Sequence, residues 1–395
     1  MISDKQIFLN HIGQTTPSPL GLEFTRAKGI YLYDKNNKAY IDLVSGVSVS
    51  NLGHCHPRII DSVKKQLDKY SHLMVYGEYI QSPQTKLARL LVENLPSQLD
   101  NVYFVNSGSE AVEGALKLSK NYTGRSEIIS FTNAYHGSTH GALSVLGNES
   151  LKTPFRPLLP DINIIDYNNF EELQKITKKT ACVIAEVIQA EAGIILPEKG
   201  FIEGLRKKCS ETGTLLIFDE IQTGFGRTGS LFAFEHYKVI PDILTIAKAM
   251  GGGLPLGAFV SSKKIMNVLS HKPPLGHITT FGGHPVSCAA GLASLQILLE
   301  KDYIKEAEQK GILFRKYLKH KAIKSIRGKG LFIAVELIKP EYVGSLLKNC
   351  LILGTVFDPF LFCKNAFRIA PPLIINKEQI KEACDILLSA LDKSV

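Results

Sequence analysis

The chain has 395 residues, of which 45% are hydrophobic and 21% are charged, a composition typical of globular proteins that bury a large core without disulfides. Its formal net charge of +9 comes from basic residues interspersed with acidic ones, which argues against nucleic-acid binding and favours a mild positive field for anionic metabolites. The start has no secretory pattern, no apolar run approaches the ~18 residues of a membrane span, and the seven scattered cysteines form no CxxC pair. We therefore expect a cytoplasmic protein with neither a disulfide framework nor a zinc knuckle.

Taken in chain order, the first predicted element is a hairpin at residues 31–43, YLYDKNNKAYIDL. A strand at 101–105 and a helix at 109–122 follow, and a second helix is predicted at 203–212. Four more short apolar runs are interpreted as buried strands, at 127–131, 181–187, 214–220 and 242–248. Continuous apolar strands separated by helices are typical of a parallel sheet covered on both faces, which predicts an α/β fold.

The last hundred residues follow another pattern. Residues 287–320 are predicted to be mainly helical, short strands follow, and a closing helix begins at Lys377. We expect a large domain at 51–283 and a smaller domain at 284–395, with the N-terminal segment 1–50 packing against the smaller one.

Lys248 and Asp219 each follow an apolar run, DILTIA and TLLIF respectively. The carboxyl edge of a parallel sheet is where α/β proteins bind ligands, and the glycines at 251–253 allow a ligand to approach the backbone closely. Alone, Lys248 is more simply a solvated strand-end residue. Asp219 is alone a helix cap, a metal ligand or the partner of a buried cation such as a pyridinium ring, whose protonated form is the stronger electron sink.

The segment FVNSGSEAVEGALK begins a helix directly after a strand. Ser107 and Glu110 have the spacing of a capping box. The free N–H groups and the dipole of such a helix start form an anion site suited to a phosphate. The alternative is a well-capped helix without a ligand.

Residues 224–229, GFGRTG, match the glycine pattern of dinucleotide-binding proteins. That pattern requires a strand immediately before it and a long helix after it. Here the five residues DEIQT intervene and the sequence that follows is a poor helix. We therefore interpret the glycines as shaping a loop of the active site.

Together, these segments resemble the class III pyridoxal-phosphate-dependent aminotransferases of fold type I, the group similar to acetylornithine and ornithine aminotransferases, over roughly residues 15–375. The resemblance implies a large domain with a mainly parallel seven-stranded sheet, and a smaller α+β domain from the N- and C-terminal segments. It implies pyridoxal 5′-phosphate as cofactor, no metal, and a homodimer with the active site at its interface. The segments that carry it are FVNSGSEAVEGALK, NAYHG, AEVIQAEAG, FDEIQTGFGRTG, TIAKAMGGGLPLGA, HITTFGGHP and FRIAPPL.

The resemblance implies that Lys248 forms the Schiff base with the cofactor and then moves the proton between Cα and C4′, and that Asp219 pairs with the pyridine nitrogen. It implies that Tyr135 stacks on the ring, for which the alternative is a core aromatic, and that Gln222 bonds the ring's 3-hydroxyl oxygen. The other cofactor-binding residues that it implies beside the ring are His136 and Glu186.

The phosphate site implied by the resemblance has two sources. Gly108 and Ser109, next to Ser107, hold the phosphate through backbone and hydroxyl groups. Thr280 reaches the phosphate of the neighbouring subunit, so the monomer is expected to be inactive.

Arg368 and Glu191 resemble a pair that controls substrate entry. The arginine holds a substrate carboxylate with a bidentate fork. When Glu191 pairs with it, the arginine is neutralised and an ω-amino donor can bind. When the pair opens, the arginine is free for a 2-oxo acid. The alternative is an ion pair of small energetic consequence.

Two positions depart from the family pattern. Ser138 stands where many relatives that act on ornithine, acetylornithine or aminobutyrate carry an arginine for a distal carboxylate, and a serine cannot supply that fork. Val187 stands where a proline is common.

The sequence thus predicts transfer of an amino group from an ω-amino donor, ornithine or N-acetylornithine by overall resemblance, to a 2-oxo acid such as 2-oxoglutarate, with ping-pong kinetics. Three alternatives stay open: another ω-amine transaminase that uses pyruvate or 2-oxoglutarate, an aminomutase or decarboxylase on the same fold, and a cofactor-free regulator.

Overall fold

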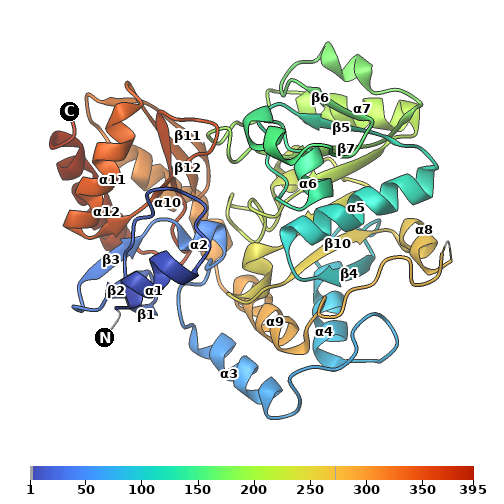
Figure 1. Ribbon diagram of the computed structural model, residues 1–395, viewed down its shortest axis with the longest axis horizontal. Coiled ribbons are helices and arrows are strands. Elements are labelled where there is room, and N and C mark those ends of the chain that lie inside the picture. Colours follow the sequence, from blue (N-terminus) through green and yellow to red (C-terminus); the bar gives the residue numbers. More distant parts are fainter. Residues whose placement is uncertain (1–2, 272) are drawn as a thin grey trace.

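The larger half of the molecule is built on a seven-stranded sheet. The computed structural model describes residues 3–271 and 273–395, and this half is the right-hand lobe of Figure 1. All pairings in the sheet are parallel except those of β10, which runs antiparallel to both of its neighbours. The strand order is β4 (Asn101–Val105), β10 (Gly257–Ser261), β9 (Ile243–Ile246), β8 (Leu215–Asp219), β7 (Thr180–Glu186), β5 (Glu127–Phe131) and β6 (Ile162–Ile165).

This sheet confirms the predicted α/β fold and its mainly parallel strands. The strands predicted at 101–105 and 127–131 have those bounds in the structure. The prediction at 242–248 was wrong at its end, because β9 stops at Ile246 and Lys248 begins a short 3-10 helix, η5 (Lys248–Gly251). The antiparallel direction of β10 could not be predicted, since an apolar run does not encode strand direction.

Helix α5 (Gly108–Thr123) leads away from the edge of the sheet where the parallel strands end. It begins at Ser107, whose hydroxyl accepts from Glu110 N, and ends at Gly124 with a left-handed φ of 67°. The predicted capping box was wrong in one bond, because the Glu110 carboxylate accepts from Asn106 N at 2.7 Å, one residue before Ser107. The reach of a glutamate side chain allows either partner, and the turn at Asn106 decides between them.

The other elements of this half are shorter or lie on its periphery. Helices α5 and α9 have 16 residues each, as does α12 of the smaller half. No helix within the described part of the chain is long and apolar enough to cross a membrane. The remaining helices of this half are α3 (Pro57–Leu67), α4 (Ser82–Val92), α6 (His140–Ser144), α7 (Phe201–Thr212) and α8 (Lys263–Met266), and the short 3-10 helices are η1 (Glu149–Leu151), η2 (Thr153–Phe155), η3 (Glu172–Lys175), η4 (Ala233–Tyr237) and η6 (Asn267–Ser270).

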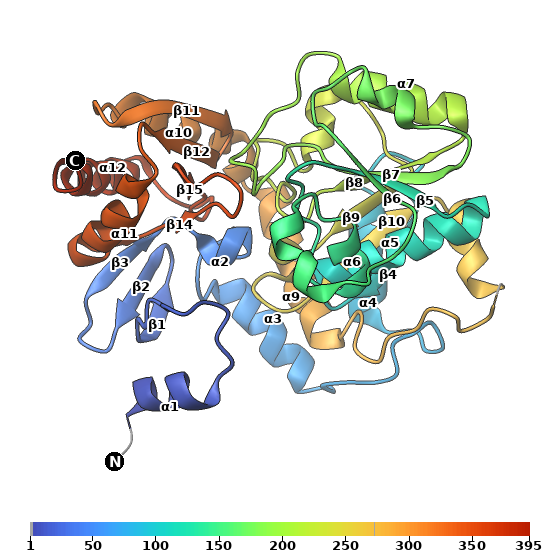
Figure 2. The ribbon, with the colours of Figure 1, turned by 45° about the horizontal axis from the view of Figure 1, so that its top comes forward.

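The smaller half joins the two ends of the chain (Figures 1 and 2). The N-terminal strands β1 (Phe24–Lys28), β2 (Tyr31–Asp34) and β3 (Ala39–Asp42) form a sheet with β13 (Thr355–Val356), which pairs parallel to β3. The predicted hairpin is β2 and β3, and the predicted closing helix is α12 (Lys377–Asp392).

A second small sheet lies beside the first. Its order is β11 (Ile323–Lys329), β12 (Phe332–Leu337), β15 (Ala366–Ile369) and β14 (Asp358–Pro359). Helices α10 (Tyr303–Tyr317), α11 (Glu341–Leu353) and α12 pack in the same lobe. Helices α1 (Asp4–His11) and α2 (Ser45–Ser48) stand before and after the N-terminal strands.

Helix α9 (Pro285–Glu300) begins two residues after the boundary predicted at 283 and confirms a helix in that region. It packs on α3, α4 and η5, all of which belong to the larger half. The division into domains stays a prediction, and these contacts favour a boundary after Glu300.

The glycine-containing segment 224–229 lies in turns and a bend after β8, and it is followed only by the five-residue 3-10 helix η4, not by a long helix. Within it, Arg227 is fully buried and donates to the carbonyls of Leu331 and Pro371 and to the side chain of Asn51. These acceptors come from both ends of the chain, so the loop ties the larger half to the smaller one.

Candidate active site

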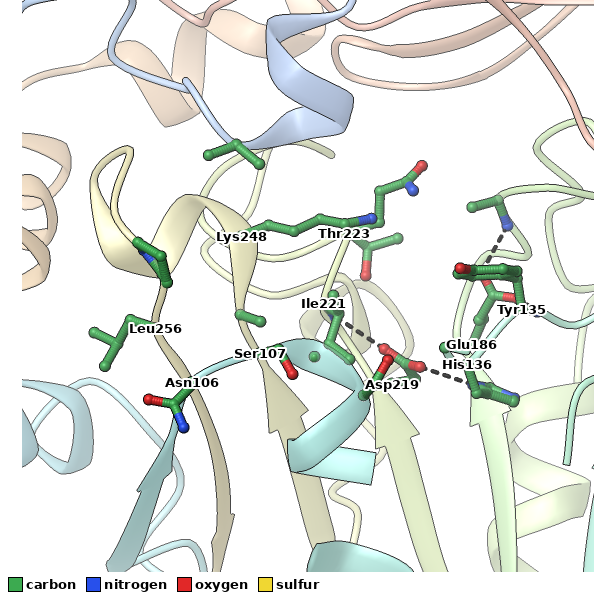
Figure 3. A pocket seen from close by; sticks show the side chains of 18 of the residues that line it. Asn106, Ser107, Tyr135, His136, Glu186, Asp219, Ile221, Thr223, Lys248 and Leu256 are labelled. Atoms are coloured by element: carbon green, nitrogen blue, oxygen red, sulfur yellow. Dashed lines mark hydrogen bonds and ion pairs between the residues drawn. The ribbon is translucent and has the colours of Figure 1, made fainter. Parts of the chain in front are cut away.

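A cavity of about 420 Å³ opens at the carboxyl ends of β7, β8 and β9 (Figure 3). Of the twelve predicted site residues, all but Arg368 and Thr280 line it. Arg368 lies directly behind two of the lining side chains, whereas Thr280 is exposed and lies outside the cavity. The ten predicted residues that line the cavity are Ser107, Gly108, Ser109, Tyr135, His136, Glu186, Glu191, Asp219, Gln222 and Lys248.

Lys248 enters the cavity from the start of η5, two residues after β9. Its backbone has a φ of 51°, a left-handed conformation that is uncommon for a residue with a side chain and is found where surrounding structure imposes it. In Figure 3 its side chain extends toward Thr223. Burial lowers the pKa of the amine to about 8, and the positive charge of Arg368 adds to this effect. The amine therefore loses its proton far more readily than an exposed lysine does.

Asp219, the last residue of β8, is hydrogen-bonded to His136. Its Oδ2 lies 2.7 Å from His136 Nδ1, and its Oδ1 accepts from Ile221 N at 3.0 Å. Because a carboxylate only accepts, Nδ1 carries the proton. Both side chains are buried, and among the described residues His136 Nε2 has no hydrogen-bond partner. The carboxylate is thus held in one orientation with unused lone pairs beside the cavity.

Glu186 lies at the end of β7, next to this pair. Its two oxygens accept from Tyr135 N at 3.0 Å and from Ala190 N at 2.8 Å. Burial raises its pKa to about 7, against the effect of His136, while Asp219 raises it further. Its side chain fixes the loop that carries Tyr135 relative to the loop after β7.

The start of α5 brings backbone close to the cavity. The first N–H groups of a helix have no partner within the helix. A Cβ added at Gly108 would lie 2.9 Å from Ile221 Cδ1, and one at Gly257 would lie 2.4 Å from Ser107 O. The hydroxyl of Ser107 is used as the helix cap, whereas Ser109 Oγ accepts from Ser138 N at 3.2 Å. A side chain at Gly257 would therefore clash with the backbone at the helix start, and one at Gly108 would require Ile221 to shift.

Tyr135 and Ser138 form the outer edge of the same site. The Tyr135 hydroxyl lies 3.1 Å from Ser138 Oγ, and Ser138 is exposed. The position at which many relatives have a long cationic side chain therefore holds a short hydroxyl that is already paired.

Arg368 lies on β15 with 1% of its side chain exposed. Its Nη2 lies 2.7 Å from Glu191 Oε1, and its Nη1 donates to Gln222 Oε1. The guanidinium also lies over the ring of Phe360, 4.9 Å from its centroid. The structure thus brings together the predicted pair of Arg368 and Glu191. The side-chain oxygen of Gln222 accepts a hydrogen bond from Arg368. The predicted contact of Gln222 with a ring hydroxyl stays a prediction.

Sequence reasoning missed Asp358, whose Oδ2 lies 3.4 Å from Arg368 Nη2. Burial raises its pKa to about 6, although Arg368 opposes this effect. The strand that carries it, β14, has only two residues, so no periodic pattern marked it in the sequence. Sequence reasoning also missed Ile221, which packs over the start of α5.

The residues around the cavity fit pyridoxal 5′-phosphate. An amine of lowered pKa suits a covalent bond to an aldehyde, and an oriented carboxylate suits a protonated ring nitrogen. The N–H groups at the start of α5, which have no partner within the helix, suit a phosphate. The volume of about 420 Å³ is in the usual range for a cofactor site.

Comparison with known proteins gives consistent matches over nearly the whole chain. The model of the family described as aminotransferase class-III matches residues 13–391. The acetylornithine aminotransferase of Methanopyrus kandleri is 37% identical over 394 residues, 99% of this chain and 100% of that protein. That of Methanocaldococcus jannaschii is 39% identical and covers 95% of this chain and 93% of its own. The structure of ornithine aminotransferase from Toxoplasma gondii, with partial occupancy of pyridoxal phosphate at its active site, has a TM-score of 0.91 and 29% identity, covering 98% of this chain and 93% of that chain.

Proposed function

Since this chain belongs to the class III aminotransferase family, and is therefore a pyridoxal-phosphate-dependent transaminase, we propose that it transfers the ω-amino group of N-acetylornithine or ornithine to 2-oxoglutarate. The relatives that are 37–39% identical are named acetylornithine aminotransferases, which supports this donor class. The observation that carries the proposal is the ion pair of Arg368 with Glu191, buried beside Lys248.

The pair gives the site two ways to bind a substrate. With Arg368 closed on Glu191 at 2.7 Å, the guanidinium is neutralised and an ω-amino donor, which has no carboxylate at its reacting end, meets no unpaired charge. With the pair open, the fork of Arg368 can bind the carboxylate next to the keto group of the acceptor in bidentate geometry. One cavity therefore serves both halves of a ping-pong reaction.

At the other end of the cavity, the side chains bind the cofactor and move one proton. When bound, pyridoxal phosphate supplies the electron sink that stabilises negative charge on the carbon next to the nitrogen. Asp219 pairs with the ring nitrogen, and His136 holds Asp219 in place through its 2.7 Å contact. The Nζ atom of Lys248, with its pKa lowered to about 8, takes the proton from the substrate carbon and returns it.

A second candidate donor follows from Ser138. Its hydroxyl is 3.1 Å from that of Tyr135, and a serine cannot clamp a distal carboxylate with a bidentate fork. A simple ω-amine without a second carboxylate would bind without such a clamp. The acceptor half-reaction would be the same for both donor classes.

We also propose a homodimer with Thr280 of each subunit at the phosphate of its partner, in the cytoplasm. Thr280 is exposed and lies between Ile278 and Phe281, which are 51% and 53% exposed. Such apolar side chains next to one another favour an interface. Light scattering tests the subunit number. Thr280→Ala should weaken cofactor binding in the dimer, and a monomer with full activity would contradict this arrangement.

Single half-reactions test the donor. Purified enzyme loaded with pyridoxal phosphate is mixed with one amine at a time, and conversion to the pyridoxamine form is followed by absorbance. N-Acetylornithine and ornithine should convert the cofactor faster than an unsubstituted alkylamine. Equal rates would favour the second candidate, and no conversion by any amine would contradict a transaminase.

Ser138→Arg sharpens this test. If the donor carries a distal carboxylate, the new guanidinium should lower its KM by about tenfold, equivalent to ~1.4 kcal/mol, with no effect on an alkylamine. Thr139→Arg, one residue farther along the same exposed loop, is the matched control for added positive charge.

A further inference from the structure

The sheet register itself places a second carboxylate against Arg368. Strand β14 pairs antiparallel with β15, and Asp358 is the direct cross-strand neighbour of Arg368. Directly opposed residues have their side chains on the same face, with Cβ atoms roughly 5 Å apart. The 3.4 Å contact of Asp358 Oδ2 with Arg368 Nη2 thus follows from the backbone and does not depend on a flexible loop.

Glu191 and Asp358 compete for the same nitrogen of Arg368. Glu191 Oε1 lies 2.7 Å from Nη2 and Asp358 Oδ2 lies 3.4 Å from it. Glu191 comes from the loop after β7, and its other oxygen accepts from Leu361 N at 3.2 Å. Its longer side chain can rotate away from Arg368 once these two contacts are exchanged for those of a substrate. Asp358 has no comparable freedom, because its short side chain is attached to a paired strand.

The exchange of Glu191 for a substrate carboxylate affects the balance of charge around Arg368. If Glu191 moves away and a substrate carboxylate takes its place, Arg368 still faces two negative groups. Asp358 is 27% exposed, so it is close to water, but its Oδ1 atom is buried and has no hydrogen-bond partner within the described part of the chain. An ionised oxygen in that position is poorly stabilised. The charged groups that act on Asp358 are Arg368 on β15, Glu191 on the loop after β7, and Lys248 on η5.

We propose that Asp358 is a specificity-determining residue that screens Arg368 from carboxylates until it takes up a proton, so that acceptor binding is coupled to protonation of Asp358. The inference rests on the proposed function, in which Arg368 binds the acceptor. On binding, the acceptor carboxylate contacts Arg368, Glu191 moves off, and Asp358 Oδ takes one proton from solvent. Burial, with a smaller effect of Glu191, already raises the pKa of Asp358 to about 6. The acceptor adds one more negative charge to the site, while Glu191 is displaced only by a rotation of its side chain, so binding raises that pKa further. Binding is therefore tighter at low pH and weakens as pH rises above about 6.

The experiment measures binding of glutarate, a non-reacting dicarboxylate analogue of 2-oxoglutarate, to the cofactor-loaded enzyme. Titration calorimetry is carried out at about pH 6 and about pH 8, each in two buffers of different ionisation enthalpy. The wild type should bind about fivefold more weakly at about pH 8 than at about pH 6, as expected for a pKa that rises by ~1 unit from about 6 on binding. On binding, it should take up ~0.4 of a proton at about pH 6 and less than ~0.1 of a proton at about pH 8. In Asp358→Asn, the affinity should be high at both pH values and the proton uptake of this group should vanish.

Two further variants separate the possible failures. Asp358→Glu, which keeps the carboxylate, should keep the pH dependence, and Asp385→Asn, which removes an exposed carboxylate paired with Lys381 on α12, should behave as the wild type. Unchanged pH dependence and proton uptake in Asp358→Asn would overturn the inference alone. Unchanged glutarate affinity in Arg368→Gln would instead contradict the proposed function.

Discussion

The cofactor end and the substrate end of the cavity are built in different ways. At the cofactor end, Lys248, Asp219 and the start of α5 follow the ends of β9, β8 and β4, three strands of one sheet. Asp219 is hydrogen-bonded to His136 and Ile221 N. At the substrate end, Arg368 comes from the other half of the molecule and divides its contacts among Glu191, Asp358 and Gln222. The contacts of Asp219 hold it in one orientation, whereas Arg368 has several partners that a substrate can replace. The proposed binding of two unlike substrates requires such replaceable partners.

The two ends are also linked electrostatically. The charge of Arg368 helps to lower the pKa of Lys248, after burial, while Glu191 opposes it. Rearrangement of the ion pairs at the substrate end therefore changes the proton affinity of the amine at the cofactor end.

The largest expected effect is at the cofactor end. Lys248→Ala removes the only amine that lines the cavity within the described part of the chain, so turnover should be abolished and the cofactor should be held without a covalent bond at best. Borohydride treatment followed by peptide mass mapping should label Lys248 in the wild type and no residue in the variant. A label on another lysine, or turnover at the wild-type rate, would contradict the assignment.

The second largest effect is expected for Asp219→Asn, in which turnover should fall about 10²–10³-fold, equivalent to ~3–4 kcal/mol of transition-state stabilisation. An amide can still accept from His136 Nδ1 but cannot hold a proton on the ring nitrogen. Asp242→Asn is the matched control, since Asp242 precedes β9 at the opposite edge of the sheet, accepts from Leu216 N and pairs with Arg206. That variant should lose thermal stability and keep the turnover of its folded fraction. Equal kcat in Asp219→Asn and the wild type would mean that Asp219 does not face the ring.

Glu191→Gln should have an intermediate effect at the substrate end. It leaves Arg368 short of one counter-charge, so the half-reaction with the ω-amino donor should slow about tenfold, ~1.4 kcal/mol, because an apolar donor chain then lies beside a less neutralised guanidinium. The half-reaction with 2-oxoglutarate should be unchanged or faster. Equal slowing of both halves would indicate a structural role for Glu191 and remove the contrast between the two substrates.

The smallest expected effect concerns the link between the ends. The rate at which the cofactor-free protein captures pyridoxal phosphate covalently should rise with pH through about 8, the pKa of Lys248, and level off above it. A lowered lysine pKa leaves the amine neutral at lower pH, so the midpoint lies below the usual 10.5. Arg368→Gln should raise the midpoint, by roughly one unit or less. A midpoint that stays the same would show that the ends are electrostatically independent.

Much of the cofactor end could be predicted from the sequence. Lys248, Asp219 and Ser107 each stand within two residues of an apolar run, and the carboxyl ends of parallel strands meet at one edge of a sheet. Even so, the predicted strand extended to Lys248, whereas in the structure Lys248 begins η5 with a φ of 51°. A residue's backbone angles at such a turn depend on what packs around it, which a linear pattern does not record.

The sequence alone determined the class of the large sheet and the residues that gather at its edge, because these follow from local apolar patterns and short motifs. The pairing of Arg368 with Glu191 was predicted only from the family resemblance. Only the tertiary structure decided that Asp358 lies opposite Arg368 and that Gln222 gives its oxygen to Arg368. These contacts join residues up to 146 positions apart in sequence, through a two-residue strand and a loop. Their distances and charges exist only once the two halves of the chain pack together.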